Sequence, residues 1–396
     1  MGKKFTKLGI RAFVNEHIEN AGDDKEAGVL NAGNQLISMT EDEDCAVTLE
    51  DASLRTLFDG LCDPDGTVDR SSAQDVQEAM MSANFPAVTG SMIYPVIMRE
   101  YDPYVKPVLS LVTETDSANK EETHVGFGAL DGFELVREGM PYDEAQPAQR
   151  KCTIKNNKFG RKISVTMEMV LFDKTGDVLK VAKGIGKKGG QHLHKLIIQT
   201  ATGLARSALG ESSSTALVVD GTARAAYADT HAAWDGVAND NSAGTTTLTI
   251  DDITSALKLF NAITDDKGDL IMCHPKTIVC NSNIAIALRS LLGSPNVAWV
   301  GAGSTTDADA SHAPMNPHFN AYTVIDSPFV TANKWYIGEF DVQTLLQWVY
   351  RLKTETLRGQ TQQSFDNDIV AQYKAGYYVG CGLVDYRYVV DAGTVA

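Results

Sequence analysis

Residues 364–388 read Ser-Phe-Asp-Asn-Asp-Ile-Val-Ala-Gln-Tyr-Lys-Ala-Gly-Tyr-Tyr-Val-Gly-Cys-Gly-Leu-Val-Asp-Tyr-Arg-Tyr. Ile369, Ala371 and Tyr373 alternate with other residues, and a period of two is typical of a strand buried on one face. Gly376 interrupts this alternation, so we expect the chain to turn there and to return as a second strand from Tyr378 onward. The stretch therefore predicts a sheet near the C-terminus.

Further strands are predicted upstream by short alternating or apolar runs between turn residues. These runs are 125–130, 133–137, 152–155, 163–169, 270–273, 277–280, 322–325, 335–337 and 345–350. Residues 139–147 are rich in turn formers and charge, which predicts a long two-stranded ribbon around this tip. Because an isolated ribbon is marginally stable, we expect it to lie on a neighbouring subunit.

A long helix is predicted over residues 177–209, where Val178, Leu193 and Ile197 share one face. Its first half contains four glycines, which weaken or kink a helix. Shorter helices are predicted over 10–18, 49–61, 251–264 (capped by Thr249) and from Asn281 to Gly293. Between residues 85 and 107, prolines at 86, 95, 103 and 107 argue against a long regular helix. Together with the strands, these helices predict an α+β fold.

Charge is distributed unevenly along the 396 residues, whose net charge is −16. Residues 1–90 contain 7 Lys and Arg against 17 Asp and Glu, whereas residues 150–206 contain 13 against 3. Blocks of one sign favour interaction surfaces, so the acidic block could pair with the basic block of the same chain or of the next copy. The alternative is that both are solvated loop charge. The net negative charge argues against a free-standing nucleic-acid binder.

The bulk composition, 43% hydrophobic and 22% charged, is that of an ordinary folded protein. Its apolar runs are far shorter than the roughly 18 residues that a membrane-spanning helix requires. The six cysteines lie far apart without a C-x-x-C pair, which indicates synthesis in a reducing cytoplasm.

Several short motifs have the letters of a functional site, but the residues around them do not fit that function. The run Gly184-Ile-Gly-Lys-Lys-Gly has the letters of a dinucleotide loop but lies within a helical pattern. His192 and His194 are two residues apart on a helix and point to different faces. The loop that begins at Asp63 lacks the glycine and glutamate of a calcium loop, and we interpret it as an acidic turn. Cys273 and His274 are adjacent, and on a strand they would face opposite ways. We expect no catalytic, cofactor or metal site.

The order of the predicted parts is an arm, a projecting ribbon, a long helix, an α+β lobe and a closing sheet. This order resembles the major capsid protein of tailed bacteriophages, the Hong Kong ninety-seven type of fold that encapsulin shells share. The 364–388 stretch looks like the family's closing element, in which a Phe-led strand, a polar turn and a final strand complete the peripheral domain. The resemblance spans roughly 91–396, and residues 1–90 depart from it.

The resemblance implies a division into domains. It would make 1–90 an acidic N-terminal arm with short helices, 91–117 the entry to the peripheral domain, 118–170 the extended loop, 171–214 the spine helix, 215–340 the axial domain around the capsomer centre, and 341–396 peripheral-domain sheet.

The resemblance also implies a non-enzymatic subunit that assembles into hexamers and pentamers of an icosahedral head around double-stranded DNA, and is therefore found in the virion. The expected partners are copies of the same chain, packaged DNA through non-specific contact, and portal, scaffold and cement proteins, with no membrane and no cofactor. The residues that we expect at contacts between subunits are Arg150, Lys151, Lys155, Lys158, Arg161, Lys162, Glu41, Asp42, Glu43 and Asp44.

Two alternatives remain open at this point. One is an encapsulin-type compartment shell, which would bind a cargo peptide in place of a genome. The other, from a different class, is a cytosolic enzyme with a nucleotide ligand, and it rests only on the glycines of 184–190.

Overall fold

The computed structural model forms two compact units, each of which is built from three stretches of the chain. Unit 1 contains Met1–Val105, Lys158–Gln191 and Tyr350–Tyr378, and unit 2 contains Lys106–Asn157, His192–Val349 and Val379–Ala396. The residues described are 7–21, 31–32, 34–35, 54–63, 67–70, 73–82, 85–127, 149–172, 177–231, 239–265, 268–295, 315–357 and 369–395.

Unit 1 begins with short helices. These are α1 (Lys7–Ala21), α3 (Leu54–Leu57), a π-helical turn η2 (Phe58–Cys62) and α4 (Ala73–Ser82). The helix predicted over 10–18 is therefore confirmed, and the one predicted over 49–61 is present from Leu54, because 49–53 lie outside the described residues. Phe58 is fully buried and packs edge-on against Phe85, with ring centroids 6.5 Å apart.

The prediction that residues 85–107 form no long regular helix is wrong. α5 (Phe85–Leu109) runs for 25 residues through all four prolines. Pro86 costs little, because the N–H groups of a first helical turn have no intrahelical partner. The other three are tolerated because the face with Ile93, Ile97 and Tyr101 is buried, and packing of an apolar face outweighs local propensity.

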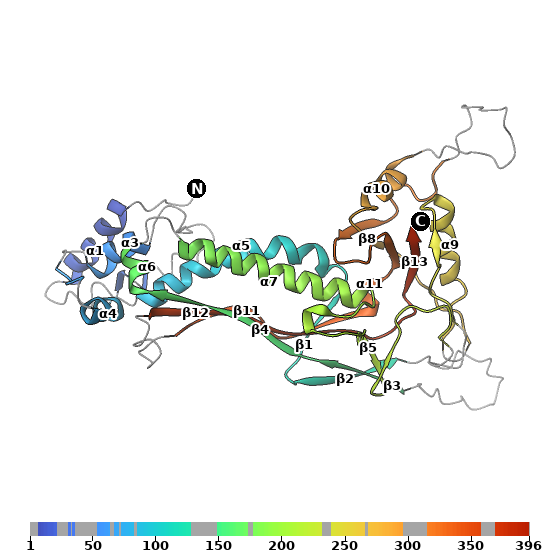
Figure 1. Cartoon of the computed structure of the whole chain (residues 1–396), viewed down its shortest axis with the longest axis horizontal. Coiled ribbons are helices and arrows are strands. Elements are labelled where there is room, and N and C mark those ends of the chain that lie inside the picture. The colour runs from blue at the N-terminus through green and yellow to red at the C-terminus, as the bar shows by residue number, and fades with distance from the viewer. Residues whose placement is uncertain are drawn as a thin grey trace, which may run out of the picture. The chain divides into compact units, whose positions relative to one another are not determined.

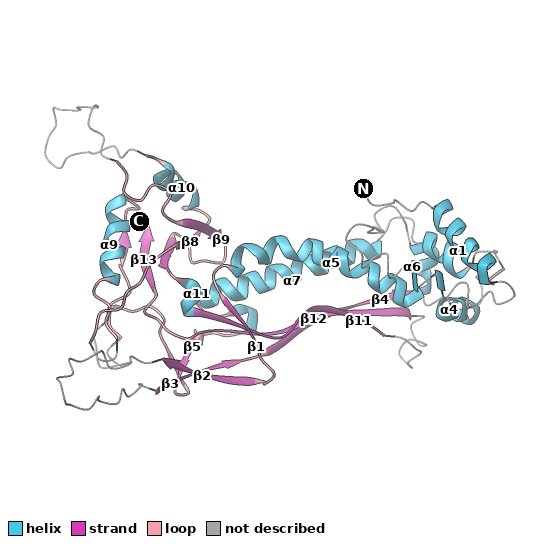
Figure 2. Cartoon of the chain, turned by 180° about the vertical axis from the view of Figure 1, so that it is seen from behind, coloured by secondary structure: helices cyan, strands magenta, loops and turns pink. Residues whose placement is uncertain are grey.

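α7 (Asp177–Ala201) is a single helix, and its glycines do not break it. The predicted end at 209 is wrong, because the helix ends at Ala201 and residues 207–209 form a separate short turn. Within unit 1, α5 and α7 lie side by side in both views (Figure 1, Figure 2). A Cβ atom at Gly190 would lie 2.7 Å from the carbonyl oxygen of Tyr101, and one at Gly186 would overlap the carbonyl oxygen of Ile97. The glycines therefore permit close approach of two helix backbones, and they do not form a phosphate loop.

The closing stretch of unit 1 also differs from the prediction. β12 (Ile369–Leu383) continues straight through Gly376, so the turn expected there is wrong. Gly376 instead faces β4 (Asn157–Thr166), where an added Cβ atom would lie 2.8 Å from the carbonyl oxygen of Phe159. The strand predicted over 163–169 ends at Thr166, where α6 (Met167–Phe172) begins.

Unit 2 contains the expected ribbon and a sheet around it. β2 (Glu121–Phe127) pairs with β3 (Gln149–Lys155) in antiparallel register, from Glu121 opposite Lys155 to Phe127 opposite Gln149. The strand predicted over 133–137 and the tip lie outside the described residues. The neighbouring strands are β1 (Thr113–Asp116), β5 (Leu217–Val219), β6 (Thr222–Arg224) and the first part of β11 (Thr344–Leu357), which pairs with β1 in parallel.

A second sheet in unit 2 has five strands in the order β7-β13-β10-β8-β9. The strands are β7 (Thr245–Thr246), β8 (Thr277–Asn281), β9 (Thr323–Ser327), β10 (Lys334–Gly338) and β13 (Val389–Val395). Helices α9 (Ile250–Phe260) and α10 (Ala285–Gly293) contribute to its core, in which Ile253, Leu288 and Trp335 are fully buried. Two further short helices are η3 (Ser207–Leu209) and α11 (Phe340–Gln343).

Around this second sheet, some predicted elements are confirmed and others are wrong. Thr249 caps α9 in a capping box with Asp252, as the composition of this turn predicts. α10 ends at Gly293 as expected, although Asn281 is the last residue of β8 and the residue at the N-cap is Ile284. The buried strand expected over 270–273 is wrong: Leu270 is 69% exposed and forms only an isolated bridge with Thr264. An apolar run of four residues is too short to specify burial.

None of the described helices has the length and the apolar content that crossing a membrane would require.

Candidate functional site

The predicted basic residues on β3 lie on an exposed face in unit 2. Lys151 and Lys155 are exposed, whereas Cys152 and Ile154 between them are buried, as alternation along a strand requires. The ammonium group of Lys155 lies 3.2 Å from the carboxylate of Glu121 on β2. One of the candidate cations is therefore already paired within its own chain.

Three of the remaining basic candidates lie on β4 in unit 1. Lys158, Arg161 and Lys162 are all exposed, and the strand becomes buried only from Ile163. Arg150 lies on β3 opposite Gly126, and its side chain is outside what the structure describes. The acidic candidates Glu41, Asp42, Glu43 and Asp44 also lie outside the described residues.

Two further lysines join this surface of unit 1. The ammonium groups of Lys158 on β4 and Lys353 on β11 lie 6.0 and 4.5 Å from the centre of the Tyr350 ring. Lys353 also pairs with Glu355 at 3.0 Å, and Lys374 on β12 pairs with the same carboxylate. Lys353 and Lys374 are not among the residues predicted from the sequence, because only strand pairing brings residues so distant in sequence together.

The basic character continues on α7. Lys180, Lys187 and Lys188 are exposed on the helix side opposite the buried residues Ala182 and Gly186. This is the amphipathic pattern of a helix with one packed face and one solvated face. Much of the positive block of the sequence thus lies on exposed surface in the described parts of both units, whereas Arg206 at its end is buried.

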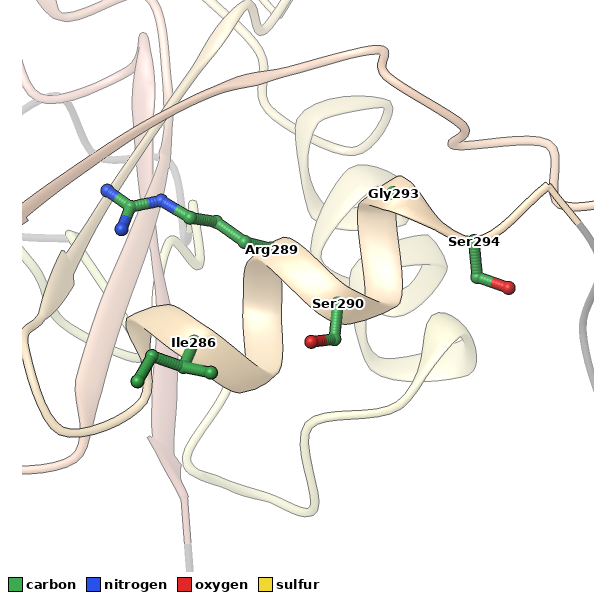
Figure 3. A pocket seen from close by; sticks show the side chains of 5 residues that line it. All are labelled: Ile286, Arg289, Ser290, Gly293 and Ser294. Atoms are coloured by element: carbon green, nitrogen blue, oxygen red, sulfur yellow. The ribbon is translucent and has the colours of Figure 1, made fainter.

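A shallow hollow of about 590 Å³ lies along one side of α10 in unit 2. Figure 3 shows the residues that line it: Ile286, Arg289, Ser290, Gly293 and Ser294. The guanidinium of Arg289 lies 2.5 Å from the carboxylate of Asp326. An aliphatic side chain, two hydroxyl groups and a paired guanidinium provide contact surface, and none of these five residues is a general base that could activate a serine hydroxyl.

The other sequence motifs also have structural explanations. His192 contacts the carbonyl oxygen of Ala208, and His194 contacts the hydroxyl of Ser327, so the two rings face different partners. Burial raises the pKa of the Cys273 thiol to about 12, assisted by the charges of Glu339 and Asp341, which disfavours the reactive thiolate. Within the described ranges, no group of three His, Cys, Asp or Glu side chains is arranged to hold a metal ion.

The acidic turn at Asp63 is held from inside unit 1. Asp63 is 1% exposed and accepts hydrogen bonds from the Val68 amide and from Arg70, at 3.2 and 2.8 Å. Arg70 also lies 3.1 Å from Asp59. The Asp63 carboxylate therefore binds Arg70 and a backbone amide of the turn, in agreement with the interpretation of this loop as an acidic turn.

Comparisons with known proteins identify the family of the chain. A family model described as phage capsid protein matches residues 153–392, more than half of the chain. None of the curated proteins compared matches it.

Solved structures with similar folds include three shell-forming or phage proteins. The capsid asymmetric unit of cyanophage Pam1 has 13% identity and a TM-score of 0.45, with 74% of this chain and 91% of that chain covered. A protein of Gordonia phage Cozz has 11% identity and a TM-score of 0.44, with coverages of 74% and 87%. A virus-like particle from Pyrococcus furiosus has 10% identity and a TM-score of 0.41, with coverages of 75% and 95%.

The family match confirms the resemblance stated from the sequence. It extends from β3 through α7 and both helices of the second sheet into β13. The chain has the mixed α and β fold with a long helix that this resemblance implies, and its place is the capsid of the virion. It therefore belongs to the phage capsid protein family and is a structural protein of a viral shell, not an enzyme.

Proposed function

We propose that this chain is the major head subunit of a tailed phage, which assembles into hexamers and pentamers of an icosahedral shell around double-stranded DNA. The observation that carries the proposal is the family match over residues 153–392. It is supported by exposed basic surface on β3, β4 and α7 in a chain whose net charge is strongly negative.

Each part of the proposed subunit has a corresponding element. The extended loop, 118–170, contains the β2–β3 ribbon, and the spine, 171–214, contains α7. The axial domain, 215–340, contains β8, β9 and β10 with α9 and α10. Because β13 pairs with β10, we place residues 389–395 with the axial sheet, and the rest of 341–396 with the peripheral sheet.

The partner that we propose for the basic surfaces is another copy of the chain. Each copy carries −16 overall, so packaged DNA would be repelled by the whole subunit even where lysines attract it locally. Oppositely charged blocks on one polypeptide, in contrast, are complementary between successive copies. DNA, portal, scaffold and cement contacts would then use other parts of the shell.

Charge reversal tests this proposal. Changing Lys155, Lys158, Arg161 and Lys162 together to Glu should abolish or strongly reduce the particles that sediment from a wild-type preparation, because attraction between copies becomes repulsion. All four side chains are exposed, so the circular dichroism of the soluble chain should not change.

A matched control is Lys258→Glu on α9, which reverses one exposed charge in unit 2 and should leave assembly intact. Wild-type yields of normal particles from the fourfold variant would contradict the charge-pairing part of the proposal. Failure of the wild-type chain to form particles would instead contradict the shell function.

A further inference from the structure

Three lysines from three strands surround one tyrosine and one glutamate on the surface of unit 1. β12 is paired with β4 and lies beside β11 in the sheet order. Lys158, Lys353 and Lys374 come from β4, β11 and β12 in turn. We call Lys158, Tyr350, Lys353, Glu355 and Lys374 the lysine cluster.

The lysine cluster has an excess of positive charge. Glu355 is its one carboxylate among the described residues, and it pairs with both Lys353 and Lys374. Hydrogen bonds, first from Lys374 and then from Lys353, lower the pKa of Glu355 to about 2, so this carboxylate is ionised at every ordinary pH. Two ammonium groups thus share a single negative charge, and their side chains, Lys353 and Lys374, are 51% and 52% exposed. Lys158 adds a third positive charge beside the Tyr350 ring.

The aromatic ring in the lysine cluster is already covered. Lys158 and Lys353 lie over Tyr350, and Tyr378 packs against it edge-on with ring centroids 5.9 Å apart. Stacking of bases on exposed aromatic rings, which supports sequence-tolerant binding of single-stranded nucleic acid, has no free platform here. The features that remain available to a partner are the unbalanced ammonium groups.

An acidic peptide fits this arrangement. Lysines on adjacent strands are spaced by about 4.8 Å between strands, and alternate side chains of an extended peptide are about 6.8 Å apart. Because only every second side chain of an extended peptide faces the same way, two of four consecutive carboxylates can face the lysines at once. The longest acidic run of the chain is Glu41, Asp42, Glu43 and Asp44, and it belongs to a segment, 1–90, with a net charge of −10.

We propose that the lysine cluster of one copy binds the acidic run at residues 41–44 of a neighbouring copy. The inference rests on the proposed shell function, since it requires copies to meet. Every copy then offers both an acidic run and a lysine cluster, which is the head-to-tail arrangement that forms rings when the rotation closes.

A charge-swap pair tests the proposal directly. Variant A changes Glu41, Asp42, Glu43 and Asp44 to Lys, and variant B changes Lys158, Lys353 and Lys374 to Glu. Each variant alone should lose most of the sedimenting particles that the wild type forms, because like charges meet at every contact. An equal mixture of A and B should regain particles that contain both chains, because each run then meets a cluster of opposite charge on the other chain.

The mixture separates contacts between copies from contacts within one copy. A contact within one chain would remain repulsive in both A and B, so the mixture would stay unassembled, whereas a chain carrying both sets of changes would assemble. That result would overturn the neighbouring-copy assignment. Particle formation by the mixture also shows that both variants fold. If variant B does not fold, a variant in which Lys158, Lys353 and Lys374 are changed to Gln replaces it. This variant should form fewer particles, and its assembly should depend less on salt. Unchanged particle yield in this variant would overturn the proposal.

Two further outcomes separate this inference from the shell function. Normal assembly of wild type, A and B alike would overturn the inference while the shell function stands, and absence of wild-type particles would remove both. Binding of duplex DNA by the wild type that variant B loses, with normal assembly of B, would assign the lysine cluster to nucleic acid and overturn the proposal. Lys258→Gln serves as the control for loss of one exposed lysine.

Discussion

Replacing Gly186 with leucine should destabilise unit 1 by about 2–3 kcal/mol, the usual cost of forcing extra atoms into a packed contact, reduced by the better helix propensity of leucine. Gly186 lies where α7 passes the backbone of α5, and even a Cβ atom would overlap the carbonyl oxygen of Ile97, with Ile97 Cα at 3.1 Å. Backbone cannot move aside as the end of a flexible side chain can. The two helices would have to separate, which exposes the apolar residues between them.

Gly184 provides a matched control in the same helix. No atom lies within 4 Å of a Cβ built there, so Gly184→Ala should stabilise the helix by about 0.5–1 kcal/mol through propensity alone. Denaturant unfolding of the soluble, unassembled chain, followed by far-ultraviolet circular dichroism, measures both changes. The packing account predicts shifts of opposite sign. Shifts of the same sign in the two variants would show that α5 and α7 do not pack through these glycines.

Replacing Arg206 with methionine should destabilise unit 2 by about 3–5 kcal/mol, the usual effect of removing one partner of a buried ion pair. The side chain of Arg206 is 10% exposed and lies 2.6 Å from the carboxylate of Glu211. It also donates to the carbonyl oxygens of Cys381 and Thr215, at 2.6 and 3.0 Å. Methionine would remove the guanidinium from the Glu211 carboxylate, which would keep only the backbone amide of residue 206 and the Thr215 hydroxyl as donors. The carbonyl oxygens of Cys381 and Thr215 would also lose the guanidinium as a donor.

An exposed ion pair supplies the contrast. The side chain of Arg289 is 52% exposed beside Asp326, and Arg289→Met should cost at most about 1 kcal/mol. Trp335 and Trp348 are buried in unit 2, so tryptophan fluorescence during denaturant unfolding reports on the relevant unit. Equal losses in the two variants would contradict a structural role for the buried pair.

The Arg206–Glu211 pair also makes stability depend on pH. Burial by itself raises the pKa of Glu211, but hydrogen bonds from Arg206 and Thr215, with the positive charge of Arg206, outweigh burial and hold the pKa below its usual value. A pKa lowered by folding means that the stabilisation is complete above the unfolded value, about 4.3, and is lost as the pH falls through the folded value. Glu211→Gln should remove this part of the acid sensitivity.

The parts of the fold that follow from local pattern were predictable from the sequence. Short alternating or apolar runs located β3, β8 and β10, and Thr249 located the start of α9. In each case, the residues that form the element are the same few neighbouring residues whose pattern predicts it. Helical periodicity likewise located α7, whose packed face is visible in the spacing of its apolar residues.

The errors at α5 and at Gly376 have one physical cause, which is that tertiary contact overrode a local preference. The prolines of α5 and the glycine at 376 are unfavourable in a helix or a strand by themselves, but buried neighbours determine the outcome. The lysine cluster was missed for a related reason. Lys158, Lys353 and Lys374 are close only because β4, β11 and β12 are neighbours, and strand pairing cannot be read from one sequence without the fold.

The most direct test of the central claim is negative-stain electron microscopy of the purified chain, with size exclusion of the same sample. The account predicts closed particles, or hexameric and pentameric rings, from this 42.8 kDa chain alone. A uniform monomer at every concentration, unchanged by crowding agents and by salt, would contradict a self-assembling shell subunit.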